Sequence, residues 1–141
     1  MSASEDFVAA YITAALWSSC GDDPDFKGKP EDNPGGVPLD TNYSEDDIAE
    51  DTLVLMRKDC DNFVAKYRGL LDRVECRRNS SGCSKDEQAG HDFWLNRNGH
   101  GVGFWDGDWT PRGLAERLSQ ACKGFGSFDL YVADDGKVHG Q

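Results

Sequence analysis

The chain has 141 residues, the length of one ordinary domain, and its composition is 38% hydrophobic and 29% charged. This composition is typical of a globular protein and excludes collagen-like, coiled-coil and membrane-spanning chains. The formal net charge is -11, and residues 1–62 carry 15 Asp and Glu against 4 Lys and Arg, so the whole acidic excess lies there. Because an acidic surface repels phosphate, direct nucleic-acid binding is not expected, whereas a basic protein surface would be attracted.

The first half of the chain predicts two helices separated by a long loop. Residues 6–17 carry apolar side chains at helical spacing, which predicts a helix. No Lys or Arg precedes them, so this segment is not expected to be a signal peptide, and we expect a cytoplasmic protein. Residues 20–43 contain four of the five prolines, which predicts an exposed loop. Ser44 and the three carboxylates after it are typical of a helix start, with a short turn at 45–49. The long amphipathic helix that follows ends near residue 74, and its apolar positions are Leu53, Met56, Cys60, Phe63, Val64, Tyr67 and Leu71.

A second polar segment, at 75–88, is predicted to be another loop. Cys76 and Cys83 lie within it and would close a small ring if they formed a disulfide, whereas in a cytoplasmic protein both would stay reduced. Cys60 and Cys122 fall on the apolar faces of predicted helices, where a free cysteine packs as a small hydrophobic side chain. A chain of this length does not need disulfides to fold.

The last third of the chain predicts a helix followed by a hairpin. Thr110 is a helix cap, Pro111 suits the first helical position and Gly124 ends the helix. Residues 128–132 then alternate as a strand, and the Asp135-Gly136 pair predicts the turn that returns the chain.

Residues 91–105 are predicted to form another hairpin. Asn98-Gly99 is the preferred two-residue type I′ turn, because both positions require a positive φ. With this turn, apolar side chains share one face, which supports the register. That face consists of Phe93, Leu95, Val102 and Phe104, and the opposite face of Asp92, Trp94, Asn96, Gly101, Gly103 and Trp105.

The second face of this hairpin carries the candidate functional residues. Glycines inside a strand weaken it unless a neighbour or a ligand approaches closely. Trp94 either covers the bare backbone at Gly103 as part of the core, or stands over an aromatic and polar groove that binds a ligand or a partner. In the second interpretation, the binding residues are Asp92, Trp94, Asn96, Arg97, His100 and Trp105.

The same segment predicts neither a metal site nor catalytic residues. His91, Asp92 and His100 are ligand types for a divalent ion. In the predicted register, however, Asp92 points away from His91, and the two histidines lie at opposite ends of the hairpin. The sequence contains no Gly-x-Ser-x-Gly motif, no Gly-rich phosphate loop and no cysteine next to a histidine. We therefore expect no metal and no cofactor, and we favour binding over enzymatic activity while leaving an enzyme as the alternative.

The most distinctive strings of the chain are Gly90-His91-Asp92-Phe93-Trp94-Leu95, Arg97-Asn98-Gly99-His100-Gly101 and Gly103-Phe104-Trp105-Asp106. They resemble a group of small bacteriophage proteins of unknown function. The likeness continues into the predicted helix after Thr110 and the string from Phe128 to Lys137, and it also touches residues 6–17 and 43–49. No catalytic or binding residue is assigned in that group, so the resemblance implies a bacteriophage source and the host cytoplasm, but no chemistry.

We predict an α+β domain over residues 1–141, with a small antiparallel sheet of about four strands, in two hairpins, packed against about three helices. The helices and strands would bury their apolar faces against one another. The predicted core sets Leu53, Met56, Cys60, Phe63, Leu114 and Leu118 against Phe93, Leu95, Val102, Phe104, Leu130 and Val132.

For function, we expect a non-structural bacteriophage accessory protein that binds a host or phage protein in the host cytoplasm, without contacting nucleic acid or membrane. One version is mimicry of DNA charge, in which the carboxylates of residues 1–62 compete for a basic host protein. Its surface would include Asp46, Asp47, Glu50 and Asp51. The alternatives are an acidic surface that serves only solubility, and a small-molecule or nucleotide-binding protein or minor enzyme that uses the aromatic face of the hairpin.

Overall fold

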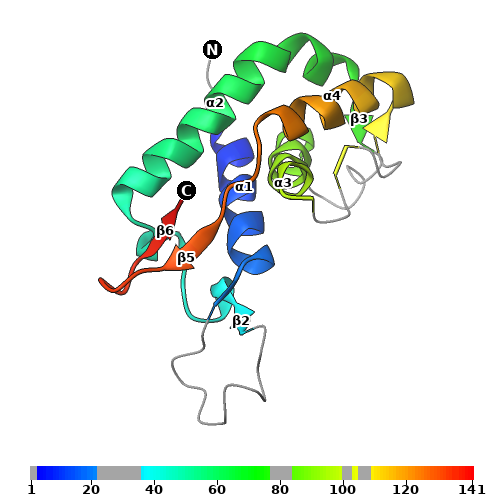
Figure 1. The fold of residues 1–141 in the computed structure, drawn as a ribbon. Helices are drawn as coiled ribbons and strands as arrows, with labels where there is room; N and C mark the ends of the chain where they lie inside the picture. Colours follow the sequence, from blue (N-terminus) through cyan, green and yellow to red (C-terminus); the bar gives the residue numbers. More distant parts are fainter. Residues whose placement is uncertain (1–2, 22–35, 77–83, 100–102, 105–108) are drawn as a thin grey trace.

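The computed structural model describes residues 3–21, 36–76, 84–99, 103–104 and 109–141, which form a mixed α+β fold (Figure 1). The four α-helices of these residues are α1 (Glu5–Ser18), α2 (Glu50–Arg73), α3 (Lys85–Arg97) and α4 (Arg112–Gly124). Their short strands are β1 (Cys20–Gly21), β2 (Val37–Pro38), β3 (Glu75–Cys76), β4 (Trp109–Thr110), β5 (Leu130–Val132) and β6 (Val138–Gly140). The predicted fold class is confirmed, but the strands form the separate antiparallel pairs β1–β2, β3–β4 and β5–β6 instead of one four-stranded sheet.

Helices α1 and α3 pack against each other through a close backbone contact. A Cβ at Gly90 would collide with the carbonyl oxygen of Phe7, so only glycine allows this approach. Ser4 is the N-cap of α1 and accepts from the backbone N–H of Phe7. The Ser4 hydroxyl also donates to Asp86 Oδ2 in the first turn of α3, over 2.7 Å. The two helices are therefore joined at their N-terminal ends as well as along their length.

An aromatic cluster forms the centre of the hydrophobic core. Phe63 of α2 stacks on Phe93 of α3, with ring centroids 4.2 Å apart. Phe104 and Phe125 contact Phe63 at centroid distances of 6.1 and 5.8 Å. Aromatic pairs of this kind contribute about 0.5–1.5 kcal/mol each beyond their burial. The cluster therefore holds α2 and α3 against the end of α4.

Most predictions outside residues 75–105 are confirmed. Helices α1, α2 and α4 match the predicted helices, and the 3-10 turn η3 (Glu45–Asp47) matches the turn before α2. The described ends of the 20–43 loop form β1, β2 and the 3-10 turn η2 (Leu39–Thr41). At α4 the N-cap is Pro111 and not Thr110, because Thr110 pairs with Glu75 in the β3–β4 ladder. The left-handed glycine that follows α4 is Gly126, with a φ of 75°.

The predicted C-terminal hairpin is also confirmed. Strand β5 pairs with β6 in the register Leu130↔Gly140, Tyr131↔His139 and Val132↔Val138. Gly136 supplies the positive φ of 80° that the turn requires. Val138 also accepts a hydrogen bond from the backbone N–H of Ala49 over 2.8 Å, so the hairpin lies against the start of α2 (Figure 1).

The predicted hairpin at 91–105 is wrong, because α3 covers Lys85–Arg97. Two local features account for the helix. Ser84 and Glu87 form a capping box at its start, with the Ser84 side chain accepting from the Glu87 N–H. The Asn98-Gly99 pair ends the helix instead of forming a type I′ turn: Gly99 has a φ of 71°, and the Asn98 side chain donates to the Trp94 carbonyl over 3.0 Å. The predicted loop at 75–88 is therefore also too long, since it overlaps β3 and the first turn of α3.

The predicted core is largely confirmed. Its buried members are Met56, Cys60, Phe63, Phe93, Leu95, Phe104, Leu118 and Leu130. Leu53, Leu114 and Val132 are partly buried against the same cluster, and Val102 lies outside the described residues. Phe93 and Leu95 reach the core from helix α3 and Phe104 from a turn after it, and none of them from a strand. The apolar positions of this segment were therefore predicted correctly, whereas its backbone conformation was not.

Candidate functional site

The predicted binding residues do not form one exposed face. Asp92, Trp94, Asn96 and Arg97 all lie on α3 and are buried, whereas His100 and Trp105 lie outside the described residues. A helix turns by about 100° per residue, so positions that would alternate on a strand point to different neighbours. The prediction that these residues share one face of a hairpin is therefore wrong, and each buried side chain has a separate role.

Asp92 is a fully buried carboxylate with specific donors. Its Oδ2 accepts from Trp109 Nε1 over 2.6 Å, and its Oδ1 lies 2.8 Å from His91 Nδ1. Because an ionised carboxylate only accepts, this contact places the proton of a neutral His91 ring on Nδ1. A buried carboxylate needs such partners to offset the loss of hydration. Asp92 consequently orients the His91 ring.

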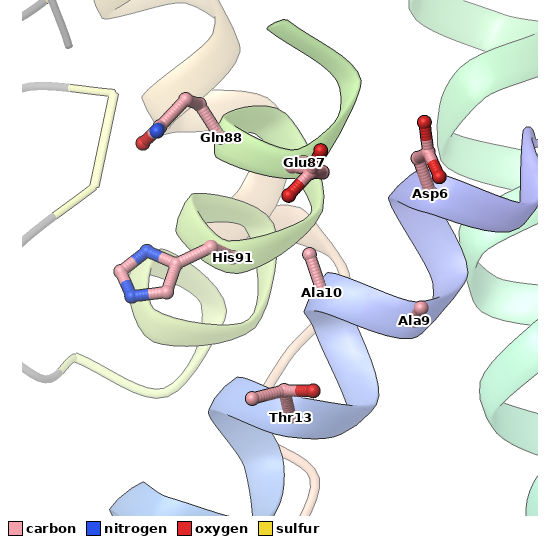
Figure 2. Close-up of a pocket in the computed structure, with 7 residues that line it drawn as sticks. All are labelled: Asp6, Ala9, Ala10, Thr13, Glu87, Gln88 and His91. Atoms are coloured by element: carbon pink, nitrogen blue, oxygen red, sulfur yellow. The ribbon is translucent and has the colours of Figure 1, made fainter. Parts of the chain in front are cut away.

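His91 stands at an open groove of about 590 Å³ between α1 and α3. Figure 2 shows Ala9 and Ala10 on the α1 wall, while Gln88 and His91 project from α3 in the same direction. The other lining residues are Asp6, Thr13 and Glu87. Trp17, at the end of α1, packs on the His91 ring with centroids 5.8 Å apart. The groove is therefore lined by one oriented imidazole, small side chains and two carboxylates.

Trp94 belongs to the core, but it does not cover Gly103. Its ring packs edge-on against Tyr11 at 5.3 Å, and its Nε1 donates to the Ser18 hydroxyl over 2.7 Å. Gly103 is covered by Asn96 instead, since a Cβ at Gly103 would lie 2.7 Å from Asn96 Cβ. Asn96 Oδ1 also accepts from the Phe104 N–H over 3.0 Å. These contacts fix the chain after α3 against the helix.

Arg97 is the most connected side chain of α3. It donates to Asp59 Oδ2 over 2.7 Å and to the Tyr11 hydroxyl over 3.0 Å. It also donates to the carbonyls of Gly126 and Phe125, over 2.8 and 3.1 Å. These bonds give two backbone carbonyls at the end of α4 a hydrogen-bond donor. Burial lowers the pKa of this guanidinium, but Tyr11 and Asp59 more than offset it, so the pKa is raised above its ordinary value. Arg97 is positioned to hold the fold together and not to meet a ligand.

The four predicted acidic residues lie together at the start of α2. Asp47 and Asp51 act on the backbone, since they accept from the N–H groups of Ser44 and Thr52 over 2.8 and 2.9 Å. Asp46 and Glu50 are exposed, and among the described residues neither side chain has a hydrogen-bond or ion-pair partner. The acidic surface is therefore partly structural and partly free to meet a partner.

Two exposed hydrophobic residues follow directly on the same helix. Val54 is 61% exposed and Leu55 is 46% exposed. Neither residue was predicted to be functional. The sequence nevertheless contains a signal for them, because both are large apolar residues that lie off the apolar stripe through Met56 and Cys60. We call Asp46, Glu50, Asp51, Val54 and Leu55 the acidic–apolar surface.

The burial of the cysteines determines how reactive their thiols are. Cys60, Cys76 and Cys122 are buried free thiols and Cys20 is exposed, while Cys83 lies outside the described residues. Burial raises the pKa of Cys60 and of Cys122, which keeps both protonated and unreactive at neutral pH.

No family model matches the chain, and comparisons with curated proteins and with solved structures likewise give no match. Among the described residues, no three His, Cys, Asp or Glu side chains gather as they would around a metal ion. In the same part of the chain, no helix combines the length and apolarity needed to cross a bilayer. The resemblance to bacteriophage proteins remains a prediction.

Proposed function

We propose that this chain is an accessory protein that binds a protein partner of basic surface through the acidic–apolar surface. The observation that carries the proposal is the exposure of Val54 and Leu55 near Asp46 and Glu50, whose side chains have no partner among the described residues. Exposed apolar side chains ringed by polar groups are typical of interaction sites.

The spacing of these residues supports a single contact surface. Glu50 and Val54, and likewise Asp51 and Leu55, are four positions apart and so are neighbours on the helix surface. Asp46 lies before the helix, in η3, and the non-helical residues Ile48 and Ala49 separate it from α2. A partner would bury the apolar pair at the centre, where most binding energy arises, and would meet the carboxylates at the rim.

The charge distribution supports a basic partner. Carboxylates that are exposed and unpaired attract a basic surface over about a Debye length, roughly 8 Å at physiological salt, and accelerate association. A DNA-binding host protein offers such a surface, and competition for it would constitute DNA-charge mimicry. Together with the resemblance to small bacteriophage proteins, this favours a role in the host cytoplasm during infection.

Affinity capture from bacterial host lysate, with quantitative mass spectrometry, tests the proposal. The Asp46→Lys/Glu50→Lys variant should lose a protein that the native chain retains, and Val54→Ser/Leu55→Ser should lose the same protein. The matched control is Asp129→Lys; it changes an exposed residue of the C-terminal segment and should retain the partner. The two surface variants leave the Asp47 and Asp51 backbone contacts in place.

The comparison must be made at physiological salt, where non-specific charge attraction is screened. Retention of the same proteins by the native chain and by both surface variants would overturn the proposal. Loss on charge reversal alone, with the serine variant unaffected, would reduce the surface to simple charge attraction and would likewise contradict the apolar centre.

The second candidate is a small polar ligand in the groove between α1 and α3. The specific observation that favours it is the orientation of His91 by a fully buried carboxylate, Asp92. A ligand at 100 times its Kd stabilises the folded state by about 2.7 kcal/mol. Thermal-shift screening with nucleotides, sugars and divalent ions should give a shift that His91→Ala removes; no shift from any of them rejects this candidate.

A further inference from the structure

A second groove, between α2 and α4, has the opposite charge to the rest of the molecule. It measures about 710 Å³, and α4 runs beside the C-terminal half of α2 (Figure 1). The residues that line it are Lys66, Tyr67, Gly69, Leu70, Arg73, Arg117, Gln120 and Ala121. Three of these are cations and none is a carboxylate, in a chain whose net charge is -11.

In the described part of the chain, none of the three cations has a carboxylate partner. Lys66 Nζ lies 5.6 Å from the centroid of the Tyr67 ring, which also lines the groove. Elsewhere in that part, ion pairs with Asp or Glu are formed by Arg57, Arg68, Lys85, Arg97 and Arg112. No described carboxylate lies within ion-pair distance of Lys66, Arg73 or Arg117. Like charges that gather without counter-charges repel one another, so a bound anion would relieve an unfavourable arrangement.

The helix faces bring these cations together. Lys66, Gly69 and Arg73 of α2 line the groove together, and Arg117 lines it from α4. Helix α2 is kinked between Lys66 and Gly69, at Tyr67, whose φ of -115° and ψ of 18° are not helical. Nothing lies within 4 Å of the position that a Cβ at Gly69 would take. A glycine inside a helix costs about 1 kcal/mol relative to alanine, and here no packing contact requires it. Its effect is to leave the floor between Lys66 and Arg73 free of a side chain.

We propose that this groove binds a small ligand that carries two or more linked phosphate groups, such as a nucleoside triphosphate. Arg73 and Arg117 approach from opposite walls, and a guanidinium suits bidentate contact with phosphate. Lys66 adds a third positive charge, and the Gln120 amide adds a neutral donor. Several adjacent anionic groups match three cations better than a single carboxylate would.

The surrounding charge favours a compact ligand over a nucleic acid. A long polyanion would extend beyond the groove onto a surface of net negative charge, where phosphate is repelled. A linked di- or triphosphate meets only the groove. This site lies away from the acidic–apolar surface, so the proposed ligand can be tested independently of the proposed protein partner.

Calorimetric titration of the full chain with inorganic tripolyphosphate and with ATP tests the proposal. Both should bind with a Kd below about 1 mM, and the affinity should fall as salt is raised. Arg73→Gln/Arg117→Gln should weaken binding by about tenfold or more, the equivalent of about 1.4 kcal/mol. The matched control is Lys58→Gln/Lys137→Gln, which removes two exposed cations outside the groove and should bind like the native chain.

A second pair of variants tests the site without removing any cation. Gly69→Glu places a carboxylate among the three cations and should abolish binding. Gly69→Gln fills the same space without a charge and should therefore weaken binding much less than Gly69→Glu does. Stronger binding of ATP than of tripolyphosphate would add a contribution from the nucleoside. The proposal would be overturned if neither probe binds, if the Arg73→Gln/Arg117→Gln variant binds as tightly as the native chain, or if only a single-stranded oligonucleotide binds.

Discussion

Replacing Arg97 with methionine should be among the most destabilising single changes on α3. The Arg97 side chain is 3% exposed and donates to a carboxylate, a hydroxyl and two backbone carbonyls. Methionine fills much of the same volume but cannot donate. The Tyr11 hydroxyl and the carbonyls after α4 would lose this partner, while Asp59 would lose its counter-charge.

The magnitude follows from these contacts. Breaking a buried ion pair by removing one partner costs about 3–5 kcal/mol. The Asp59 side chain is 26% exposed and recovers part of its hydration, which favours the lower end of that range. We therefore expect Arg97→Met to reduce the free energy of unfolding by about 3 kcal/mol.

Urea denaturation followed by circular dichroism measures this loss. Arg112→Met is the matched control, because Arg112 and its partner Glu116 are 70% and 62% exposed, and such surface pairs contribute about 0–1 kcal/mol. Combining Arg97→Met with Asp59→Leu should recover part of the loss, since no unpaired charge then remains. A loss for Arg97→Met no larger than that of the control would refute the structural role of Arg97 and leave it available to a ligand.

Three further predictions concern the packing of α3 and the buried thiols. Trp94→Ala should cost about 3–5 kcal/mol, as expected for a core aromatic, and a loss under 1 kcal/mol in urea denaturation would contradict its burial. Gly90→Ala should cost at least about 1–3 kcal/mol by overpacking, whereas Gly113→Ala, with open space at its Cβ, should be neutral or stabilising; equal effects would refute the close helix contact. Because burial raises the pKa of Cys60 and Cys122, their contribution is fully present below the unfolded pKa, near 8.5, and is lost as pH rises above it, by up to about 1.4 kcal/mol per pH unit for each thiol. Unfolding curves from pH 7 to 10 should show this decline, and a flat profile would argue against it.

Local patterns were sufficient for α1, α2, α4 and the C-terminal hairpin. An apolar stripe with a helical period, a cap such as Ser44 before carboxylates, and an Asp135-Gly136 turn act through neighbouring residues. Ser44 caps the 3-10 turn before α2, whereas the N-cap of α2 itself is Ala49, which has no side-chain capping bond. The acidic character of the α2 start was likewise readable from the sequence. What the sequence did not show is that Asp47 and Asp51 bond to the backbone, while Asp46 and Glu50 remain exposed.

The segment from Lys85 to Gly99 was decided by tertiary contacts. Asn98-Gly99 suits a hairpin turn and a helix end equally well, because both use a positive φ at glycine. The capping box at Ser84 favours a helix locally, but the deciding contacts come from distant parts of the chain. Gly90 must lie against the backbone of Phe7, and Arg97 must reach Asp59 and the chain after α4.

The two grooves likewise consist of residues that the sequence shows but that only tertiary packing brings together. The sequence contains Lys66, Arg73 and Arg117 as separate charges on predicted helices, and it contains His91 beside Asp92. Which cations share a groove depends on how α2 packs on α4, and the orientation of His91 depends on Trp109 helping to hold a carboxylate in the core. Local chemistry thus determined α1, α2, α4 and the C-terminal hairpin, whereas long-range packing decided α3 and which side chains meet, because burial and close backbone contact depend on residues far apart in the sequence.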